Sequence, residues 1–415
     1  MAVDSPVRRG QPRGAGSGHR WWRPALALAA TLLSTVASGV FAATDAHAAV
    51  FPLPDPDGFY AAPPNIGDYR PGDVVRSRTV PAPGFPGATA WQLLYRSSNS
   101  SSAPIAAVTT VLVPGGAGGN RPLVSYQPFV NSLGLQCAPS HTLFNGHLQE
   151  APALNLLLAR GWAVAVPDHL GPTSAYGAAQ LGGRLVLDGI RAARGFGPAG
   201  LAGSPVGLAG YSGGGMATGF AAAMAPDYAP ELPIVGVAMG GVPVNIGKLA
   251  LDLGKTPHPL FGLGFAATVG LEREYPSVMS LDGALKPAGF ALRDRIANAC
   301  TDEIISAAAN KDFTSYLRGG AADVGPAQIA IIHQNSLETY PGVIHAPLYQ
   351  WAGGTDQVNP YLARQSAGRY CAAGTRVLFE MIPGADHGTA ILPGATHAFG
   401  YLADRFAGIP APSNC

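Results

Sequence analysis

The feature that most constrains this chain is the segment Gly210-Tyr211-Ser212-Gly213-Gly214, which joins two stretches of different character. An apolar run ending at Ala209 precedes the segment, and a run of small residues from Met216 to Met224 follows it. This order predicts a strand, a sharp turn that carries Ser212, and then a helix. The flanking glycines permit a turn that a Cβ atom would block. Because the chain contains 55 glycines, the five-residue pattern alone is weak evidence.

Strand-like and helix-like segments alternate along most of the chain. The expected strands are residues 90–95, 105–113, 123–127, 162–166, 206–209, 234–239, 347–351 and 376–382. The expected helices are residues 153–160, 178–193, 216–224, 361–371 and 390–406. Long apolar strands that alternate with helices are typical of a parallel sheet covered on both faces. The fold class is therefore α/β, with a mostly parallel sheet flanked by helices.

The alternation stops between residues 245 and 334, where more highly charged helix-like segments appear at 271–275, 291–308 and 311–318. This interruption predicts a helical cap inserted into one α/β domain, which would comprise residues 49–244 and 335–415. At the start of that domain, residues 49–85 are rich in Pro and Gly and predict an extended arm over the surface.

The first 48 residues have the features of a secretory signal peptide. Five arginines precede an uncharged run from Pro24 to Thr44, and Ala46-His47-Ala48 supplies a small-residue site for cleavage after Ala48. The proline and several polar residues in the run argue against a membrane anchor. Arg8-Arg9 leaves a twin-arginine export route open, although the general secretory route fits better. A secreted protein without stable membrane insertion is expected.

Cleavage after Ala48 would leave 367 of the 415 residues, with 21 basic and 23 acidic side chains and a formal charge of −2. A nearly neutral chain has no electrostatic surface for nucleic acid. All four cysteines, Cys137, Cys300, Cys371 and Cys415, fall in this part, and an even number in an exported protein predicts two disulfides. Spacing alone allows three pairings. No metal site is expected, and the sequence does not indicate an oligomeric state.

An acid and a histidine occur after Ser212 in the order that nucleophilic catalysis in an α/β sheet requires. Asp356 follows the expected strand 347–351, and His387 follows the expected strand 376–382. A serine hydroxyl becomes nucleophilic when a histidine accepts its proton and a carboxylate orients that histidine. The carboxyl ends of parallel strands meet at one edge of the sheet, which is where we expect Ser212, Asp356 and His387 to converge.

Each of these assignments has an alternative. Asp356 could instead cap the helix that begins near Pro360, and His397 in the terminal helix is a rival base. Asp386 is adjacent to His387, but neighbouring loop side chains usually point apart. The remaining histidines are expected to be structural or exposed: His141, His147, His169, His258, His333 and His345.

An oxyanion intermediate needs fixed hydrogen-bond donors. One should be the backbone N–H of Gly213, next to the nucleophile, and the other should come from the loop 127–132, which contains Asn131. On sequence alone, an ordinary turn that begins at a proline is the better interpretation of this loop. Gly195-Phe196-Gly197-Pro198-Ala199-Gly200 matches a dinucleotide-binding pattern, but it follows a helix and contains a proline, so no cofactor is expected.

Several short motifs recur in the order found in one known family. They are Ser125-Tyr126-Gln127, Cys137-Ala138-Pro139-Ser140, Val166-Pro167-Asp168, Leu187-Asp188-Gly189, Gly210-Tyr211-Ser212-Gly213-Gly214, Tyr228-Ala229-Pro230-Glu231-Leu232 and Leu402-Ala403-Asp404-Arg405-Phe406. Over about residues 60–410 the chain resembles the secretory lipase family.

The resemblance implies an α/β-hydrolase fold with a helical cap, which acts on carboxylic esters including acylglycerols without a cofactor. Ser212, Asp356 and His387 match the nucleophile, acid and base of that family. The resemblance also implies disulfides Cys137–Cys300 and Cys371–Cys415. The chain departs from the family at one position, since the family usually has an aspartate where this chain places Asn131.

The sequence thus predicts a secreted lipase or carboxylesterase, with an ester substrate that it could meet at a lipid–water interface. Residues 260–271 would line or gate an acyl-chain tunnel. An acyltransferase that uses the same three residues remains open, because only the acceptor of the acyl group differs. A non-catalytic binding protein with this fold is the third hypothesis, and the retention of all three residues argues against it.

Overall fold

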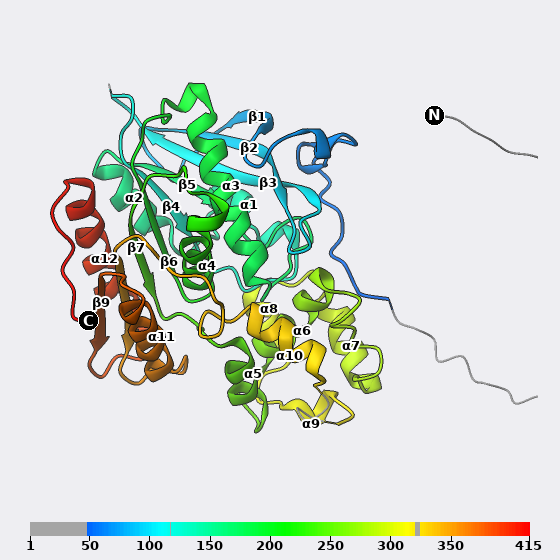
Figure 1. Ribbon diagram of the computed structural model, residues 1–415. Coiled ribbons are helices and arrows are strands. Elements are labelled where there is room, and N and C mark those ends of the chain that lie inside the picture. Colours follow the sequence, from blue (N-terminus) through cyan, green and yellow to red (C-terminus); the bar gives the residue numbers. More distant parts are fainter. Residues whose placement is uncertain (1–47, 117, 320–323) are drawn as a thin grey trace, which may run out of the picture. The chain divides into compact units, whose positions relative to one another are not determined.

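The computed structural model describes residues 48–116, 118–319 and 324–415. The predicted signal peptide lies outside the described residues, except for Ala48. A nine-stranded sheet runs through the described part, in the order β1-β2-β3-β5-β4-β6-β7-β8-β9 (Figure 1). The strands are β1 Val74–Val80, β2 Ala88–Ser98, β3 Pro104–Pro114, β4 Leu123–Gln127, β5 Ala163–Pro167, β6 Val206–Tyr211, β7 Ile234–Gly240, β8 Leu348–Gly353 and β9 Val377–Ile382.

The sheet is antiparallel at one end and parallel elsewhere. β1, β2, β3 and β5 pair antiparallel, whereas β5, β4, β6, β7, β8 and β9 pair parallel. Helices connect the parallel strands, as such crossovers require. This arrangement is the α/β-hydrolase fold that the alternation and the family resemblance predicted.

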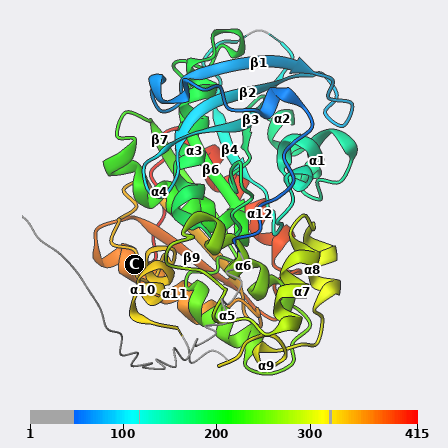
Figure 2. The same ribbon diagram turned by 90° about the vertical axis from the view of Figure 1, so that its right-hand side faces the viewer.

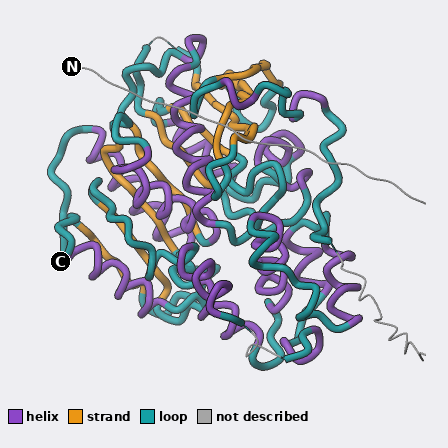
Figure 3. The backbone as a smooth tube through the Cα atoms, turned by 45° about the vertical axis from the view of Figure 1, so that its right-hand side comes forward, coloured by secondary structure: helices purple, strands orange, loops and turns teal. Residues whose placement is uncertain are grey.

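Helices cover both faces of the sheet (Figure 3). On one face, α3, α4 and α11 pack against the strands through a core that includes Leu185, Phe220 and Tyr370. On the other face, α1, α2 and α12 contribute Leu143, Leu157 and Phe399 to a second core. These helices are α1 Pro139–Asn145, α2 Ala151–Ala159, α3 Ala179–Gly195, α4 Gly213–Tyr228, α11 Pro360–Ala372 and α12 Ile391–Phe406. The sheet is therefore buried on both sides, which explains its continuous apolar strands.

Between β7 and β8 the described chain is helical. It forms α5 Ile246–Gly254, α6 Phe261–Glu274, α7 Pro287–Ile296, α8 Thr301–Ala307, α9 Phe313–Tyr316 and α10 Pro326–Gln334. These helices gather in one group, with their own apolar core around Phe261, Phe265 and Ile304 (Figures 1 and 2). None of the helices in the described residues is both long and apolar enough to span a membrane.

Three local expectations differ from the structure. The arm was expected to stay extended to residue 85, but β1 forms within it and pairs with β2. Arg76 and Arg78 make β1 look polar, as is common for an edge strand. The single helix expected at 291–308 is two helices, because Glu303 accepts a hydrogen bond from the Cys300 N–H in a capping box that starts α8. Helices α5 and α10 were not predicted.

Candidate active site

Ser212 stands on the turn between β6 and α4. Its backbone has φ 53° and ψ −121°, an unfavourable conformation for a residue with a side chain. The glycines around it are required by close contacts. A Cβ on Gly214 would lie 1.9 Å from the carbonyl oxygen of Gln127, and one on Gly210 would lie 2.5 Å from Thr218 Oγ1. The glycine spacing in the motif therefore has a steric cause, which is the tight packing of α4 against β4 and β6.

His387 links the other two predicted residues. Its Nδ1 lies 2.8 Å from Asp356 Oδ1 and 3.0 Å from Oδ2, and its Nε2 lies 2.9 Å from Ser212 Oγ. A carboxylate only accepts hydrogen bonds, so Nδ1 carries the proton and Nε2 is free to accept the hydroxyl proton of Ser212. The Asp356 side chain is fully buried, whereas 26% of the His387 side chain is exposed. The geometry is that of a nucleophile, a base and an orienting acid.

Neighbouring groups fix the loop that carries His387. Tyr211 donates its hydroxyl hydrogen bond to the His387 carbonyl at 2.5 Å, and its ring lies 5.1 Å from the imidazole. Burial raises the pKa of Tyr211, which keeps this phenol protonated as a donor. A Cβ on Gly241, whose φ is +55°, would lie 2.9 Å from His387 Cε1. The backbone of Val358 also donates to Asp356 Oδ1 at 2.7 Å.

The alternative acids and bases are engaged elsewhere. Asn359, not Asp356, caps α11, since its Oδ1 accepts from the N–H of Tyr361 at 3.0 Å and of Leu362 at 3.2 Å. His397 in α12 pairs with Glu380 at 2.9 Å. The carboxylate of Asp386 accepts from the backbone and hydroxyl of Thr389.

The Asn131 side chain lies next to Gly213, the other residue predicted to supply an oxyanion donor. Gly213 begins α4, so its N–H belongs to a helix end with no intrahelical acceptor. A Cβ on Gly213 would lie 2.8 Å from Asn131 Oδ1, which places the Asn131 side chain over this glycine. Within the part of the chain that the structure describes, neither backbone N–H has a hydrogen-bond partner. Neither N–H group is therefore engaged by another part of the described chain.

An apolar cavity of about 110 Å³ opens onto Ser212 and His387. Helices α5 and α6 contribute apolar side chains to its wall, including Leu249, Leu253 and Leu263. The segment 260–271, predicted to line an acyl-chain tunnel, contributes Leu260, Leu263, Gly264 and Ala267. Among the described residues, no group of three or more His, Cys, Asp or Glu side chains could hold a metal ion.

Both disulfides implied by the family resemblance are present. Cys137–Cys300 joins the segment before α1 to the start of α8, and Cys371–Cys415 joins α11 to the last residue. The first therefore links the helical insertion to the sheet, and the second anchors the C-terminus.

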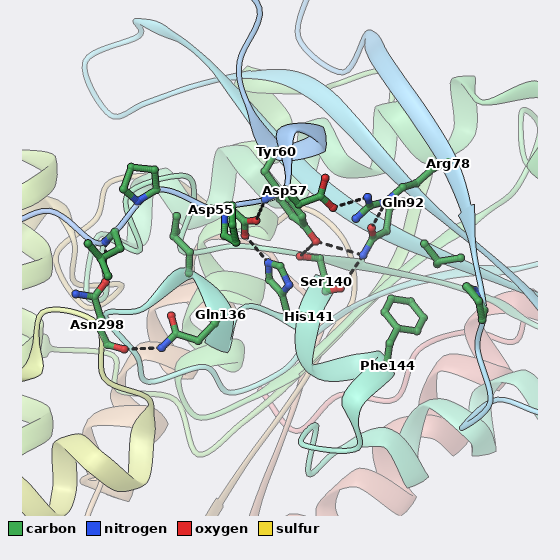
Figure 4. A pocket seen from close by; sticks show the side chains of 16 residues that line it. Asp55, Asp57, Tyr60, Arg78, Gln92, Gln136, Ser140, His141, Phe144 and Asn298 are labelled. Carbon is green, nitrogen blue, oxygen red and sulfur yellow. Dashed lines mark hydrogen bonds and ion pairs between the residues drawn. The ribbon is translucent and has the colours of Figure 1, made fainter.

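A larger pocket of about 870 Å³ lies under the N-terminal arm, and neither Ser212, His387 nor Asp356 lines it. Figure 4 shows its polar side chains paired with one another. His141 Nε2 lies 2.7 Å from Asp55, Arg78 lies 2.5 Å from Asp57, and Ser140 donates to Asp168 at 2.6 Å. We call this set, completed by Tyr60 and Gln92, the arm network.

The sequence did not predict the side chains that hold the turns and loops of the site in place through hydrogen bonds. Tyr211 and Thr218 lie in or near the motif, but nothing in the pattern assigns them a role. Thr218 donates to Gln127 Oε1 at 2.7 Å and so connects α4 to the end of β4. Glu150 and His169, which contact the oxyanion loop, are far from the motif in sequence. Only an isolated acidic residue before an apolar helix could have drawn attention to Glu150.

Comparison with known proteins decides the family. The sequence model of the family described as "Secretory lipase" matches residues 146–414. The chain belongs to the secretory lipase family. This secretory lipase is a carboxylic ester hydrolase with the α/β-hydrolase fold, as the motifs predicted.

Its relatives include lipase A of Arthroderma benhamiae, 32% identical over 87% of this chain and 81% of the relative. A secreted triacylglycerol lipase of Malassezia globosa is 33% identical over 85% of this chain and 79% of its own length. A protein of Mycobacterium tuberculosis named a probable inactive lipase is 32% identical over 86% and 83%. Because relatives of equal similarity carry different names, the positions of the side chains bear on activity more directly than overall identity.

Solved structures support the same family. The structure of Candida antarctica lipase A has a TM-score of 0.82 and 29% identity, covering 88% of this chain and 89% of that chain. A structure of the same lipase in its closed state has a TM-score of 0.80 and 28% identity, covering 88% and 91%. The resemblance inferred from motifs is thus confirmed over most of the chain.

Proposed function

We propose that Ser212, His387 and Asp356 are the catalytic triad of this secretory lipase. His387 takes the proton of Ser212 as its Oγ attacks the ester carbonyl, and Asp356 stabilises the imidazolium that forms. His387 then gives that proton to the leaving alcohol, which leaves an acyl-enzyme on Ser212. A water molecule then attacks the acyl carbonyl as His387 takes its proton. The bond between Ser212 Oγ and the acyl group breaks as His387 returns that proton to Oγ, and the carboxylic acid leaves. The hydrogen-bonded chain from Ser212 to Asp356, at 2.9 and 2.8 Å, is the observation that carries this proposal.

The oxyanion of each tetrahedral intermediate binds the backbone N–H groups of Gly213 and Asn131. The helix end at Gly213 adds a favourable dipole. The donor at position 131 is the backbone N–H, which asparagine and aspartate share. The change from the aspartate that is usual in the family to Asn131 therefore leaves this donor in place.

The preferred substrates are esters with apolar acyl groups, including acylglycerols. The leucine-rich wall of the cavity supports this assignment, since it favours an apolar chain over a charged one. The relative from Malassezia globosa is named a triacylglycerol lipase, which agrees with it. Residues 245–334 act as a cap over the triad and meet the substrate at a lipid–water interface.

The protein acts outside the cell after removal of residues 1–48. Two disulfides are consistent with an oxidising compartment, and the relative from Malassezia globosa is named as secreted.

A panel of 4-nitrophenyl esters, from acetate to palmitate, and an emulsified triacylglycerol test the proposal together. The expected kcat/KM rises with chain length, and the emulsion releases fatty acid. Ser212→Ala serves as the blank in each assay. Activity on acetate alone, with none on longer esters, would contradict the substrate assignment and leave the triad intact.

A further inference from the structure

The loop between β4 and the helical turn Leu135–Cys137 carries Asn131 without regular secondary structure. Its backbone groups therefore need partners from outside the loop. Ser174 donates to the carbonyl of Ser132 at 3.2 Å, and Arg273 donates to that of Leu133 at 2.8 Å. These contacts hold the end of the loop. Its beginning depends on two buried titratable side chains that the proposed mechanism does not use.

Glu150 is the first of these two side chains. Its Oε2 accepts from the backbone N–H of Phe129 at 2.8 Å, and its Oε1 accepts from the Tyr126 hydroxyl at 2.9 Å. Only 7% of Glu150 is exposed, and no Lys, Arg or His of the described residues forms an ion pair with it. Burial raises the pKa of Glu150 to about 8, because the charged form of a carboxyl group is costly in a site without a counter-charge. That cost makes Glu150 a candidate for a role other than stability.

His169 is the second side chain that holds the beginning of the loop. Its Nε2 lies 2.8 Å from the Pro128 carbonyl oxygen, and only 3% of the residue is exposed. A carbonyl can only accept, so Nε2 carries the proton and donates. Burial lowers the pKa of His169, which favours the neutral ring that makes this single donation.

The hydrogen bonds of Glu150 and His169 are made to the same peptide group. The carbonyl of Pro128 and the N–H of Phe129 belong to the same planar unit, and in a trans peptide they point in opposite directions. Glu150 and His169 therefore bind this plane at both ends, and a rotation of the plane would break both hydrogen bonds. The turn that carries Ser212 also packs closely against this peptide, since a Cβ on Gly214 would lie 2.8 Å from the Pro128 oxygen.

We propose that Glu150 and His169 are positioning residues that fix the Pro128–Phe129 peptide plane, and thereby aim the Asn131 N–H at the oxyanion. This inference rests on the proposed function of Ser212 and Asn131. Neither side chain touches the substrate. Their effect should therefore appear in the rate of the chemical step and in the binding of tetrahedral adducts, but not in the binding of the ester.

Glu150→Leu, Glu150→Gln and Tyr126→Phe test the proposal with a soluble ester. Leucine removes the acceptor of the Phe129 N–H, so kcat should fall about 10- to 100-fold with KM within about twofold. Glutamine keeps an acceptor oxygen and should retain kcat within about threefold. Tyr126→Phe is the matched control, because it removes the other hydrogen bond to the same carboxylate and should leave kcat near that of the wild type.

Inhibition by a trifluoromethyl ketone, which forms a tetrahedral adduct on the serine, should weaken in Glu150→Leu by the same factor as kcat. Circular dichroism establishes that each variant is folded. If the leucine variant does not fold, Glu150→Asp replaces it, because the shorter side chain should lower kcat where glutamine does not.

A folded Glu150→Leu or Glu150→Asp with wild-type kcat would overturn the proposal. So would an equal loss in Tyr126→Phe, which would assign the effect to the packing of α2 against β4. Turnover that persists in Ser212→Ala would instead refute the proposed function, whatever the Glu150 variants do.

Discussion

Two histidine–aspartate pairs in this protein have nearly the same length and different surroundings. His387 lies 2.8 Å from Asp356, and His141 lies 2.7 Å from Asp55. A serine is close to each pair, Ser212 in the first case and Ser140 in the second. The first pair lies at the apolar cavity, whereas the second belongs to the arm network (Figure 4).

The difference lies in where each proton goes. His387 binds Asp356 through Nδ1 and keeps Nε2 for the hydroxyl of Ser212. His141 uses Nε2 for Asp55, and Ser140 donates its hydroxyl to Asp168 rather than to a histidine. A carboxylate that accepts a hydrogen bond from a serine hydroxyl holds it in place without activating it as an imidazole would. Proximity of serine, histidine and aspartate is therefore insufficient; the order of donors and acceptors decides.

The largest contrast should appear between the two serines. Ser212→Ala should lower kcat by about 10⁴- to 10⁶-fold, because the nucleophile is lost. Ser140→Ala should leave kcat unchanged within about twofold, since its hydroxyl has no imidazole partner. Initial rates on a 4-nitrophenyl ester measure both. A Ser140→Ala variant as inactive as Ser212→Ala would break the comparison.

The two aspartates should differ by a smaller factor. Asp356→Asn should lower kcat by about 10³- to 10⁴-fold, since the amide no longer holds the required tautomer of His387. Asp55→Asn should keep full kcat and lower the free energy of unfolding by about 1 kcal/mol, because one buried hydrogen bond is weakened. Rates and urea denaturation of both variants provide the test. Similar kcat values for the two would remove the distinction between the pairs.

The arm network should also respond to pH through Asp168. Burial raises the pKa of Asp168 from 3.8 to about 6, against the lowering effect of its hydrogen bonds from Ser140. The folded protein therefore holds this proton more tightly than the unfolded chain. Its contribution to stability is present below about pH 4 and is lost as the pH rises to about 6, an effect of about 3 kcal/mol.

Asp168→Asn lacks this titration, so its stability relative to the wild type should increase between pH 4 and pH 7. Urea denaturation at the two pH values measures the change. A constant difference would show that the carboxyl titrates alike in the folded and unfolded chains.

The smallest effect is expected at the exposed end of the arm network. The Arg78 and Asp57 side chains are 34% and 41% exposed, so their ion pair should contribute less than about 1 kcal/mol. Asp57→Asn keeps the acceptor for the Phe59 N–H at the cap of the turn. Thermal unfolding with and without 0.5 M salt should give nearly equal values for variant and wild type. A loss comparable to that of Asp55→Asn would show that the whole arm network acts as one unit.

The sequence was sufficient to predict that Ser212, Asp356 and His387 come together, because each of them follows a strand in a glycine-bearing turn. Parallel strands end at one edge of the sheet, so strand order alone brings Ser212, Asp356 and His387 together. The sequence could not separate Asp356 from a helix cap, since either role places an aspartate in that turn. The structure gives the cap to Asn359.

Contacts between distant segments escaped prediction for a physical reason. Glu150 and Phe129 are 21 residues apart and His169 and Pro128 are 41 apart, so no local periodicity relates them. The edge strand β1 was missed because the polar run Arg76-Ser77-Arg78-Thr79 made this segment resemble a loop in sequence. Helices α5 and α10 lie in the insertion, where no alternation with strands indicates their limits.

The central claim is that the donor order at His387, and not at His141, activates a serine. Reaction of the wild-type protein with a 4-nitrophenyl alkylphosphonate, followed by peptide mass spectrometry, tests this claim most directly. We expect one adduct per molecule, on the peptide that contains Ser212, and none in Ser212→Ala. An adduct on Ser140, or stoichiometric labelling that persists in Ser212→Ala, would contradict it.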